Sequence, residues 1–366
     1  MIFRRRPMRW GRMAAIIIAV TLVGAGARAI WANGFFSSTL SGFNGSCQVL
    51  ARLPGVSDIE ISGNTAFLAV SSARGPDAGD GIYALTLGGA PNGGMAKPVK
   101  LAGAPKDFHP RGIGTFPSPD GKGLFLMAVN HRSTTKGNRN RFSIDSFEVT
   151  NPQIAPALVA EGTIEGGLLT DPQDVVAGGP GTFYVANNGA ADNAPMRWLQ
   201  DYGVIPGGNI LYFNGMSFRV MAEGLYGPRS LVLTGDGQHL LVSGMLSRNF
   251  KSYRRESFSG TLTDEDQALT LPAGPDRITM GPNGNLLVGA HANLHDWRGF
   301  AADAARPSAS QVMRVSLDGG APMSVTPVYG NDGKQIGGAS VAAYDGHHLL
   351  IGSSLDGRLL SCTPGK

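Results

Sequence analysis

Charged and polar side chains recur at the start of six similar segments of this chain. Each segment opens with small or polar residues and an aliphatic one, passes through a Gly/Asp/Asn/Pro turn, and continues into an apolar run. The first positions of the segments are Ser57, Arg111, Gln173, Arg229, Asp276 and Ala339, and the second positions are Asp58, Gly112, Asp174, Ser230, Arg277 and Ser340. Because unpaired buried charges are costly, these arginines and aspartates must neutralise one another, an anionic ligand or a metal ion.

Asp58 and Asp174 share the second position of their segments. If both face one channel, their carboxylates repel each other unless a cation lies between them. Calcium prefers oxygen ligands of this kind. Arg277, at the same position of another segment, is the competing cation, and residue types alone leave both alternatives open.

Histidines and asparagines end three of the apolar runs: His131 in VNH, Asn187 and Asn188 in ANN, and His291 in GAH. We expect them to lie on the same rim as Arg111 and Asp276. His131 and Asp276 are the candidates for a general base, although a lone histidine is more often a hydrogen-bonded structural residue. The sequence has no G-x-S-x-G, H-E-x-x-H or phosphate-loop motif.

The spacing of the segments indicates the elements that carry these residues. Each segment reads as two short strands joined by a hairpin turn and is followed by two weaker strand patterns, which is typical of a propeller blade. Six copies predict an all-β, six-bladed β-propeller covering residues 37–366 as one domain. The first strand of each blade is innermost, so the starts of the first strands and the ends of the second strands share one rim of the channel.

The N-terminal residues 1–36 predict an export signal or a membrane anchor. Arginines precede an apolar stretch from Met13 to Ala27, and small residues at 27–29 resemble a cleavage site. Ile30, Trp31, Phe35 and Phe36 could instead extend an uncleaved anchor into the interface, which we slightly favour. In both cases the positive-inside rule places the propeller outside the cytoplasm, in the periplasm or extracellular space.

The only two cysteines, Cys47 and Cys362, lie at the two ends of the repeat array. In an exported domain they can oxidise, and a bond between them would join the last blade to the first. The alternative is two buried free thiols. Their position favours a disulfide that closes the propeller.

Two segments between the repeats stand out. Residues 189–208 carry Met196, Trp198, Leu199 and Tyr202 at helical spacing, which indicates a lid, a membrane-touching helix or a surface helix. Residues 247–256 alternate basic and aromatic side chains, which we interpret as a solvated strand.

Beyond residue 28 the chain has 25 basic and 27 acidic residues, so a nucleic-acid partner is not expected.

Taken in order, the segments resemble the serum paraoxonases and arylesterases, six-bladed calcium-dependent lactonases related to gluconolactonases and strictosidine synthase. The resemblance is carried by SDIEI, HPRGIGTF with FLMAVNH, QDVVAGGPGTFYVANN, DRITMGPNGNLLVGAH, and ASQVMRV followed by GGASVAAYDGHHLLIGSSLDGRLLSC. It implies a terminal disulfide at Cys47 and Cys362 and a retained N-terminal hydrophobic segment over residues 13–33.

The resemblance also implies two calcium sites, which differ in this chain. The structural calcium of the family would be held by Asp58, Asp174 and the backbone carbonyl of Ile113, so we expect one calcium. The ligands of the catalytic calcium correspond to Ser57, Gln173, Arg229, Arg277 and Asp276, of which only the aspartate keeps the family's residue type. Guanidinium groups repel calcium, so this second ion is not expected.

Three functions fit these residues. The first is a lactone or ester hydrolase for an anionic small molecule, in which Arg111, Arg229 and Arg277 replace the metal, Gln173 joins the binding site, and His131 or Asp276 is the base. The family's histidine pair is reduced to His131, because Arg111 occupies the other position. The second is a binding protein for an anionic small molecule, and the third is an internal Arg/Asp network without a ligand.

Overall fold

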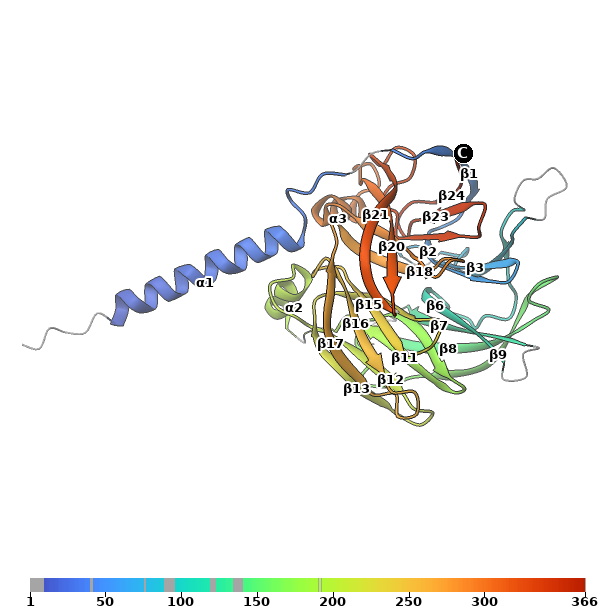
Figure 1. Ribbon diagram of the computed structural model, residues 1–366, viewed down its shortest axis with the longest axis horizontal. Coiled ribbons are helices and arrows are strands. Elements are labelled where there is room, and N and C mark those ends of the chain that lie inside the picture. The colour runs from blue at the N-terminus through green and yellow to red at the C-terminus, as the bar shows by residue number, and fades with distance from the viewer. Residues whose placement is uncertain are drawn as a thin grey trace, which may run out of the picture.

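The computed structural model describes residues 10–39, 42–75, 77–88, 96–118, 123–133, 141–189, 191 and 193–365. Six four-stranded antiparallel sheets follow one another around a central channel. One long helix projects away from them (Figure 1). The predicted six-bladed propeller is therefore confirmed. The N-terminal arginines at positions 4, 5, 6 and 9 lie outside the described residues.

Each predicted segment forms the first two strands of a blade. Blades 1 to 3 contain β2 Val56–Ser62, β3 Thr65–Val70, β4 Gly81–Thr86 and β5 Val99–Lys100; β6 Pro110–Pro117, β7 Leu124–Arg132, β8 Arg141–Thr150 and β9 Ala157–Ile164; and β10 Pro172–Gly179, β11 Thr182–Asn187, β12 Gly208–Phe213 and β13 Phe218–Leu225. Blades 4 to 6 contain β14 Pro228–Leu233, β15 His239–Gly244, β16 Asn249–Arg255 and β17 Leu262–Thr270; β18 Gly274–Met280, β19 Leu286–His291, β20 Ser310–Asp318 and β21 Ala321–Asn331; and β22 Val341–Tyr344, β23 Leu349–Gly352, β24 Arg358–Pro364 and β1 Gly45–Arg52.

The first strands of neighbouring blades contact one another around the channel, which makes them the inner ring. Apolar side chains fill the wedges between blades. Phe67 of blade 1, for example, packs with Leu126 and Phe147 of blade 2, and Tyr184 of blade 3 packs with Leu240 and Tyr253 of blade 4. The core is thus divided among the blade interfaces. The first and second positions of the six segments, which we call the ring positions, are left to line the channel.

Blade 6 is completed by the first strand of the chain, because β1 pairs with β24 at the outer edge of that sheet. Cys47 of β1 and Cys362 of β24 are opposite each other in this ladder and form a disulfide that joins positions 315 residues apart. The predicted closure by Cys47 and Cys362 is confirmed.

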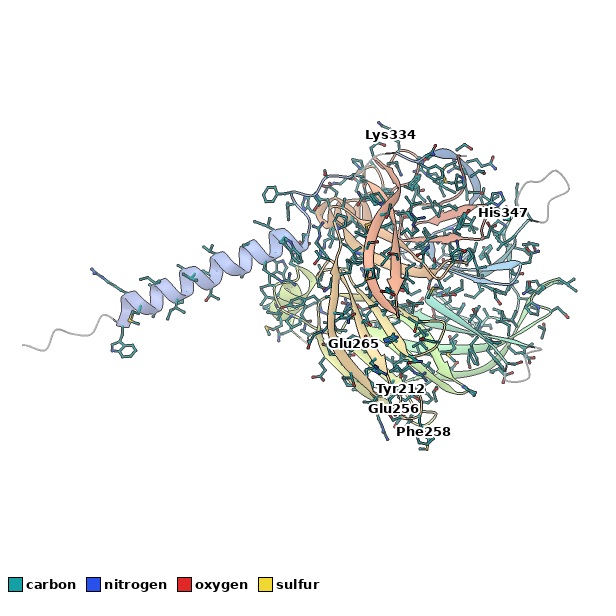
Figure 2. All side chains as sticks on the ribbon, in the orientation of Figure 1. Tyr212, Glu256, Phe258, Glu265, Lys334 and His347 are labelled. Atoms are coloured by element: carbon teal, nitrogen blue, oxygen red, sulfur yellow. A yellow bond between two sulfur atoms is a disulfide. The ribbon has the colours of Figure 1, made fainter. Side chains whose placement is uncertain are left out.

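The helix α1 (Trp10–Ala32) is long and apolar enough to cross a membrane by length and composition. A signal sequence passes the same test. Its side chains stand free of the propeller along most of its length (Figure 2). Its end is fastened to the propeller, because Asn33 is buried, donates from Nδ2 to the Tyr202 carbonyl at 3.1 Å, and accepts from the Leu294 amide at 2.9 Å.

Two short helices lie at the same end of the propeller. The helix α2 (Ala194–Asp201) comes from the 189–208 insertion, of which residues 190 and 192 lie outside the described residues, and it buries none of its side chains. Trp198 is exposed. The helix α3 (Leu294–Ala302) follows blade 5's second strand and buries Leu294 and Phe300.

The 247–256 segment forms strand β16 as predicted, but its solvated interpretation was wrong, since Phe250 and Tyr253 point into the core.

Candidate functional site

The two ring positions of each blade are adjacent in sequence, yet neighbouring residues of a regular strand point to opposite faces. The structure resolves this conflict with register shifts in the first strands. The ladders shift between Val56 and Asp58, Pro110 and Ile113, Pro172 and Asp174, Pro228 and Ser230, and Pro275 and Ile278. A bulge re-aims a side chain, so consecutive residues such as Asp276 and Arg277 both reach the channel.

A cavity of about 280 Å³ lies at the predicted rim. Its wall contains Ser57, Arg111, His131, Asp171, Gln173, Arg229, Asp276, Arg277, Trp297, Ser340, Ser354 and Leu355, with Ala73 and Ala301. All the residues predicted as catalytic or ligand-binding therefore line one cavity. Asp58, Ile113 and Asp174, the predicted metal ligands, are in the adjoining buried layer of the channel.

The three arginines of the cavity differ in how they are held. Arg277 donates to the carbonyl oxygens of Ser57 at 3.1 Å and Arg229 at 2.5 Å. Arg229 donates to Gln173 Oε1, and its guanidinium lies 5.7 Å from the centre of the Trp297 ring. No hydrogen bond from the Arg111 guanidinium reaches the described residues. None of the three guanidiniums forms an ion pair with a described carboxylate.

The pKa values of Arg111 and Arg277 shift in opposite directions, because their charged neighbours differ. Burial, and then the positive charges of Arg277 and Arg229, lower the pKa of Arg111. Burial alone would also lower the pKa of Arg277, but the negative charges of Asp174, Asp58 and Asp276 outweigh it and raise that pKa. The carboxylates of the protein thus compensate Arg111 less than they compensate Arg277.

Asp276 and His291 form a buried pair, with Oδ2 and Nε2 3.1 Å apart. Burial opposes ionisation of the carboxyl, yet the hydrogen bond from His291 and the charge of Arg229 lower the pKa of Asp276 to about 2. Trp297 packs on the His291 ring with centroids 5.1 Å apart. His291 Nδ1 and Trp297 Nε1 are buried without a hydrogen-bond partner among the described residues.

His131 contacts the Pro172 carbonyl through Nε2 at 2.6 Å. Since a carbonyl can only accept, we assign the ring proton to Nε2, which leaves the lone pair on Nδ1. Burial, and then the charge of Arg111, lower the pKa of His131 to about 3. The histidine is therefore neutral at physiological pH, but it is a weak base while the cavity contains no anion.

Asp58 and Asp174 each link two neighbouring blades. Asp58 accepts from the amides of Ile59 and Ile113, both at 2.9 Å. Asp174 accepts from the amides of Val175 and Leu231, also at 2.9 Å, and from Ser230 Oγ at 2.5 Å. Burial and mutual repulsion raise the pKa of Asp58, and burial raises that of Asp174, while Arg277 acts in the opposite direction on both.

The buried layer that contains Asp58 and Asp174 offers some, but not all, of the oxygen ligands that calcium needs. Asp58, Asp174 and the Ile113 backbone supply hard oxygen donors, and Gly112 leaves a cradle beside Asp174, because an added Cβ would lie 2.3 Å from Asp174 Oδ1. Calcium takes about six to eight oxygens, so water would have to complete the set. No group of three or more His, Cys, Asp or Glu side chains suited to a metal occurs in the part of the chain that the structure describes.

The positions corresponding to the family's catalytic calcium do not fit that ion. Arg229 and Arg277 place two cationic groups in the cavity wall, and Gln173 Oε1 is occupied by Arg229. Guanidinium has no acceptor atom to ligate a metal.

Several cavity residues were missed by sequence reasoning. Asp171 accepts from Gln173 Nε2 at 2.8 Å and from Asn188 Nδ2 at 3.1 Å, and it lies only two residues before the Gln173 ring position. Trp297 comes from α3, for which Asn293 as N-cap and the spacing of Leu294, Trp297 and Phe300 were an available signal. Glu60, two residues after Asp58, is not part of the cavity wall, but burial and then the charge of Asp58 raise its pKa.

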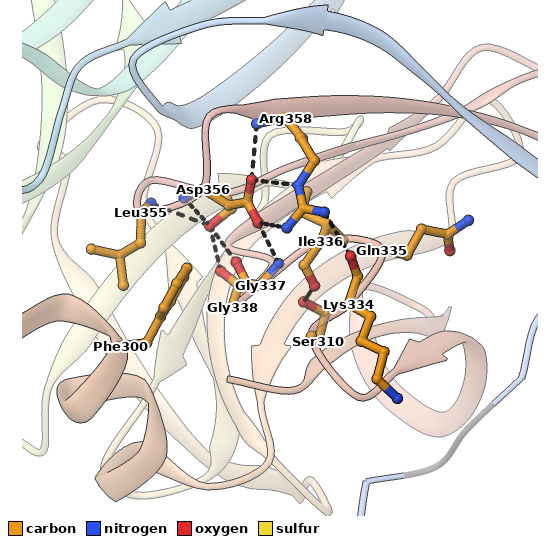
Figure 3. A network of polar contacts seen from close by, with 12 residues as sticks. Phe300, Ser310, Lys334, Gln335, Ile336, Gly337, Gly338, Leu355, Asp356 and Arg358 are labelled. Carbon is orange, nitrogen blue, oxygen red and sulfur yellow. Dashed lines mark hydrogen bonds and ion pairs between the residues drawn. The ribbon is translucent and has the colours of Figure 1, made fainter. Parts of the chain in front are cut away.

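A polar network holds the blade 6 side of the cavity (Figure 3). Asp356 accepts from the Gly337 amide at 2.7 Å and from Arg358 Nε at 2.8 Å. Arg74 then donates to the carbonyls of Leu355 and Phe300. These contacts fix the loop of Ser354 and Leu355 against α3.

A family model described as Arylesterase matches residues 75–363. The chain belongs to the arylesterase family. Among similar proteins, serum paraoxonase/arylesterase 2 of Bos taurus is 28% identical over 326 residues, covering 87% of this chain and 88% of the relative. The arylesterase family assignment agrees with the resemblance inferred from the sequence.

Solved structures with similar folds are more distant from this arylesterase-family chain. The PQQ domain of pyranose dehydrogenase from Coprinopsis cinerea superposes with a TM-score of 0.56 at 12% identity, covering 90% of this chain and 97% of that one. A gluconolactonase of Xanthomonas campestris superposes with a TM-score of 0.50 at 13% identity, covering 87% and 89%. At such identities the likeness concerns the fold alone.

Proposed function

We propose that this arylesterase-family protein is an exported hydrolase for lactones or aryl esters that carry a carboxylate. The observation that carries the proposal is the set of three guanidiniums, from Arg111, Arg229 and Arg277, that line one cavity without an ion pair to a described carboxylate. Crowded, buried positive charges that the protein compensates only in part are costly. An anionic ligand would remove that cost.

Arg111 is the proposed receptor for the ligand carboxylate. Its guanidinium has no hydrogen bond to the described residues, and a guanidinium fork binds a carboxylate through two parallel hydrogen bonds. Gln173 is engaged by Arg229 and Asp171, so its proposed role is to hold Arg229 in place rather than to bind the ligand alone.

Arg229 is the proposed electrophile. Hydrogen-bonded to Gln173 and stacked near Trp297, it is pre-oriented to donate to the oxyanion that develops when water adds to the ester carbonyl. Arg277 contributes charge from deeper in the wall, since its nitrogens already bond two backbone carbonyls.

His131 Nδ1 and the Asp276 carboxylate are the candidate bases that accept the proton of the attacking water. Their pKa values of about 3 and about 2 are low partly because positive charge surrounds them. An anionic ligand on Arg111 would cancel part of that charge and so raise both pKa values toward a useful range.

We further propose that one calcium ion is held by Asp58, Asp174 and the Ile113 carbonyl. It would supply positive charge that relieves the repulsion between the two buried carboxylates and stabilises the channel. The reaction proposed above makes no use of it.

Export and membrane attachment through the N-terminal helix complete the proposal. The apolar α1 and the Cys47–Cys362 disulfide both support a location beyond the cytoplasm, because disulfides persist in oxidising compartments. The partners are then a membrane at α1 and a small anionic molecule at the cavity.

One observation favours a second function, that of a binding protein for an anionic small molecule. Both candidate bases have pKa values far below neutrality, which suits capture of an anion better than activation of water. The two functions share the same ligand chemistry and differ only in turnover.

A substrate panel decides between them. The full-length protein is assayed with lactones and aryl esters, each as a neutral compound and as its carboxylated analogue, with and without a chelator. We expect chelator-resistant hydrolysis of the carboxylated compounds, and a loss of about 100- to 1,000-fold in kcat for Arg229→Ala. Arg111→Ala should raise KM for the carboxylated compounds and leave the neutral ones unchanged.

Arg219→Ala, on the exposed face of β13, is the matched control. Thermal stabilisation by carboxylates without hydrolysis would establish the binding protein. If no anion stabilises the protein and every arginine variant merely lowers its melting temperature, both functions are wrong and the arginines form an internal network.

A further inference from the structure

A second cluster of chemically active side chains lies on the same rim, beside the cavity. Asp80 directly precedes β4, His109 directly precedes β6, and Ser133 directly follows β7. His109 is two residues before Arg111 in the chain. The proposed hydrolase reaction does not use any of these three residues.

The three side chains are connected in the order of a nucleophile, a base and an orienting carboxylate. Ser133 Oγ lies 3.1 Å from His109 Nε2, and His109 Nδ1 lies 2.7 Å from Asp80 Oδ2. In hydrolases of unrelated folds this arrangement activates a serine, because the carboxylate fixes the imidazole tautomer whose Nε2 lone pair accepts the hydroxyl proton.

Solvent exposure increases from Asp80 to His109 to Ser133, as a site with a buried orienting acid and an accessible nucleophile requires. The side chain of Asp80 is 2% exposed and that of His109 is 15% exposed, whereas Ser133 is exposed. The orienting acid is therefore shielded from water, and the hydroxyl is open to a reactant.

Backbone and side-chain contacts hold the cluster in place. The Ser72 amide donates to Asp80 Oδ1 at 3.1 Å, and the Asp77 amide donates to Asp80 Oδ2 at 3.3 Å. The His109 amide donates to Asn130 Oδ1 at 2.9 Å, and Asn130 Nδ2 in turn donates to the buried Asp145 at 2.8 Å. Carboxylate and imidazole thus come from different blades but are anchored independently.

Asp107 is a competitor for the same nitrogen. Its Oδ1 also lies 3.1 Å from His109 Nε2, and it accepts the Ser133 amide at 3.0 Å. With a proton on Nε2, the ring donates to Asp107. With Nε2 unprotonated, it accepts from Ser133. Asp107 has φ of 60°, in the left-handed region, where a non-glycine residue is uncommon and often functional.

We propose that Ser133, His109 and Asp80 form a second nucleophilic site, distinct from the arginine-lined cavity, that reacts with small activated acyl esters and phosphonyl fluorides. Ser133 Oγ attacks the acyl carbon while His109 Nε2 takes the hydroxyl proton. The leaving alcohol departs with that proton, and water then hydrolyses the acyl-serine with His109 as base. With a phosphonyl fluoride, a bond forms between Ser133 Oγ and phosphorus, fluoride leaves, and the proton stays on His109.

The test is covalent labelling of the full-length protein with a fluorophosphonate probe, followed by peptide mass spectrometry. We expect the label on Ser133, and its complete loss in Ser133→Ala. His109→Gln should slow labelling by about 100- to 10,000-fold, the range that a general base contributes. Asp107→Asn, which suits the left-handed backbone and removes the competing charge, should label faster than wild type.

Two further variants test whether labelling is specific to this site. Ser217→Ala removes another exposed serine and should leave labelling unchanged. Arg229→Ala should also leave it unchanged, so failure of the cavity proposal and failure of this one give different results. No label on Ser133 in wild type, or equal labelling of His109→Gln, overturns the proposal. In that case a fall in melting temperature for His109→Gln would identify His109 as a structural residue that bridges two carboxylates.

Discussion

Gly112 and Asp174 meet across the boundary between blades 2 and 3 at a distance that leaves no room for a side chain. A Cβ on Gly112 would lie 2.3 Å from Asp174 Oδ1 and 2.5 Å from its Cα. Because Gly112 of blade 2 has no side chain, the Asp174 carboxylate of blade 3 can enter the channel. The acidic layer of Asp58 and Asp174 therefore depends on a glycine at this ring position.

Gly112→Ala should consequently destabilise the protein by roughly 1–3 kcal/mol, the usual cost of overpacking, because Asp174 and its strand must move. Chemical denaturation measures the change. Gly235→Ala is the control, since a Cβ at Gly235 meets nothing within 4 Å. Equal stability of the two variants would show that blades 2 and 3 separate without cost.

His131 predicts a specific pH dependence of stability. Its pKa is lowered from 6.5 to about 3 in the folded state, so between these values the unfolded chain binds a proton that the folded protein does not. Stability contributed by this group is fully present above pH 6.5 and is lost as the pH falls toward 3, with a maximum slope of about 1.4 kcal/mol per pH unit.

The difference in unfolding free energy between wild type and His131→Gln isolates this contribution, because other titrating groups cancel. We expect the difference to shrink as the pH falls through that window. A difference that is constant with pH would mean that folding leaves the pKa of His131 unchanged.

Metal analysis tests the acidic layer. We expect about one calcium per chain after dialysis, because Asp58, Asp174 and Ile113 supply oxygens while Arg229 and Arg277 exclude the second ion. Added calcium should raise the melting temperature of wild type but not of Asp174→Ala, which should lose both the ion and much of its stability. Two ions per chain, or none, would contradict the assignment.

Removal of the disulfide should lower stability substantially. The bond between Cys47 and Cys362 closes a loop of 315 residues, for which the chain-entropy estimate is about 6 kcal/mol. The Cys47→Ser/Cys362→Ser protein should melt at a lower temperature than wild type, and a reductant should lower the melting temperature of wild type only. A reductant effect of equal size in the double variant would point to another cause.

The sequence was sufficient for the blades and for the membership of the rings, because the turn-flanked apolar runs repeat in register from Ser57 to Ala339. It could not explain how Asp276 and Arg277 both reach the channel, since strict alternation forbids it. That depends on bulges, which are a property of pairing between strands and leave no mark on one strand's own pattern.

The other omissions have a similar origin. Trp297 reaches the cavity from α3, and Asp171 from the loop before β10, so both depend on connections outside the repeat. The aromatics of β16 were placed in solvent because basic neighbours dominate the segment, yet Phe250 packs against blade 5 and Tyr253 packs against blade 3. Both aromatics are buried because blade 4 has a neighbour on each side and its strand ladder shifts between Lys251 and Tyr253, which the sequence of one strand does not reveal.

The pairing of β1 with β24 sets the order in which the protein can mature. The strand β1 has its partner 315 residues further along the chain at the Cys47–Cys362 position, so the other five blades are synthesised before blade 6 is complete. Until then, Cys47 has no partner for its disulfide and blade 1 lacks one of its two neighbouring blades. A chain in which β24 has not yet paired with β1 is therefore an open ring with unpaired strand edges, and such edges expose it to association with other chains.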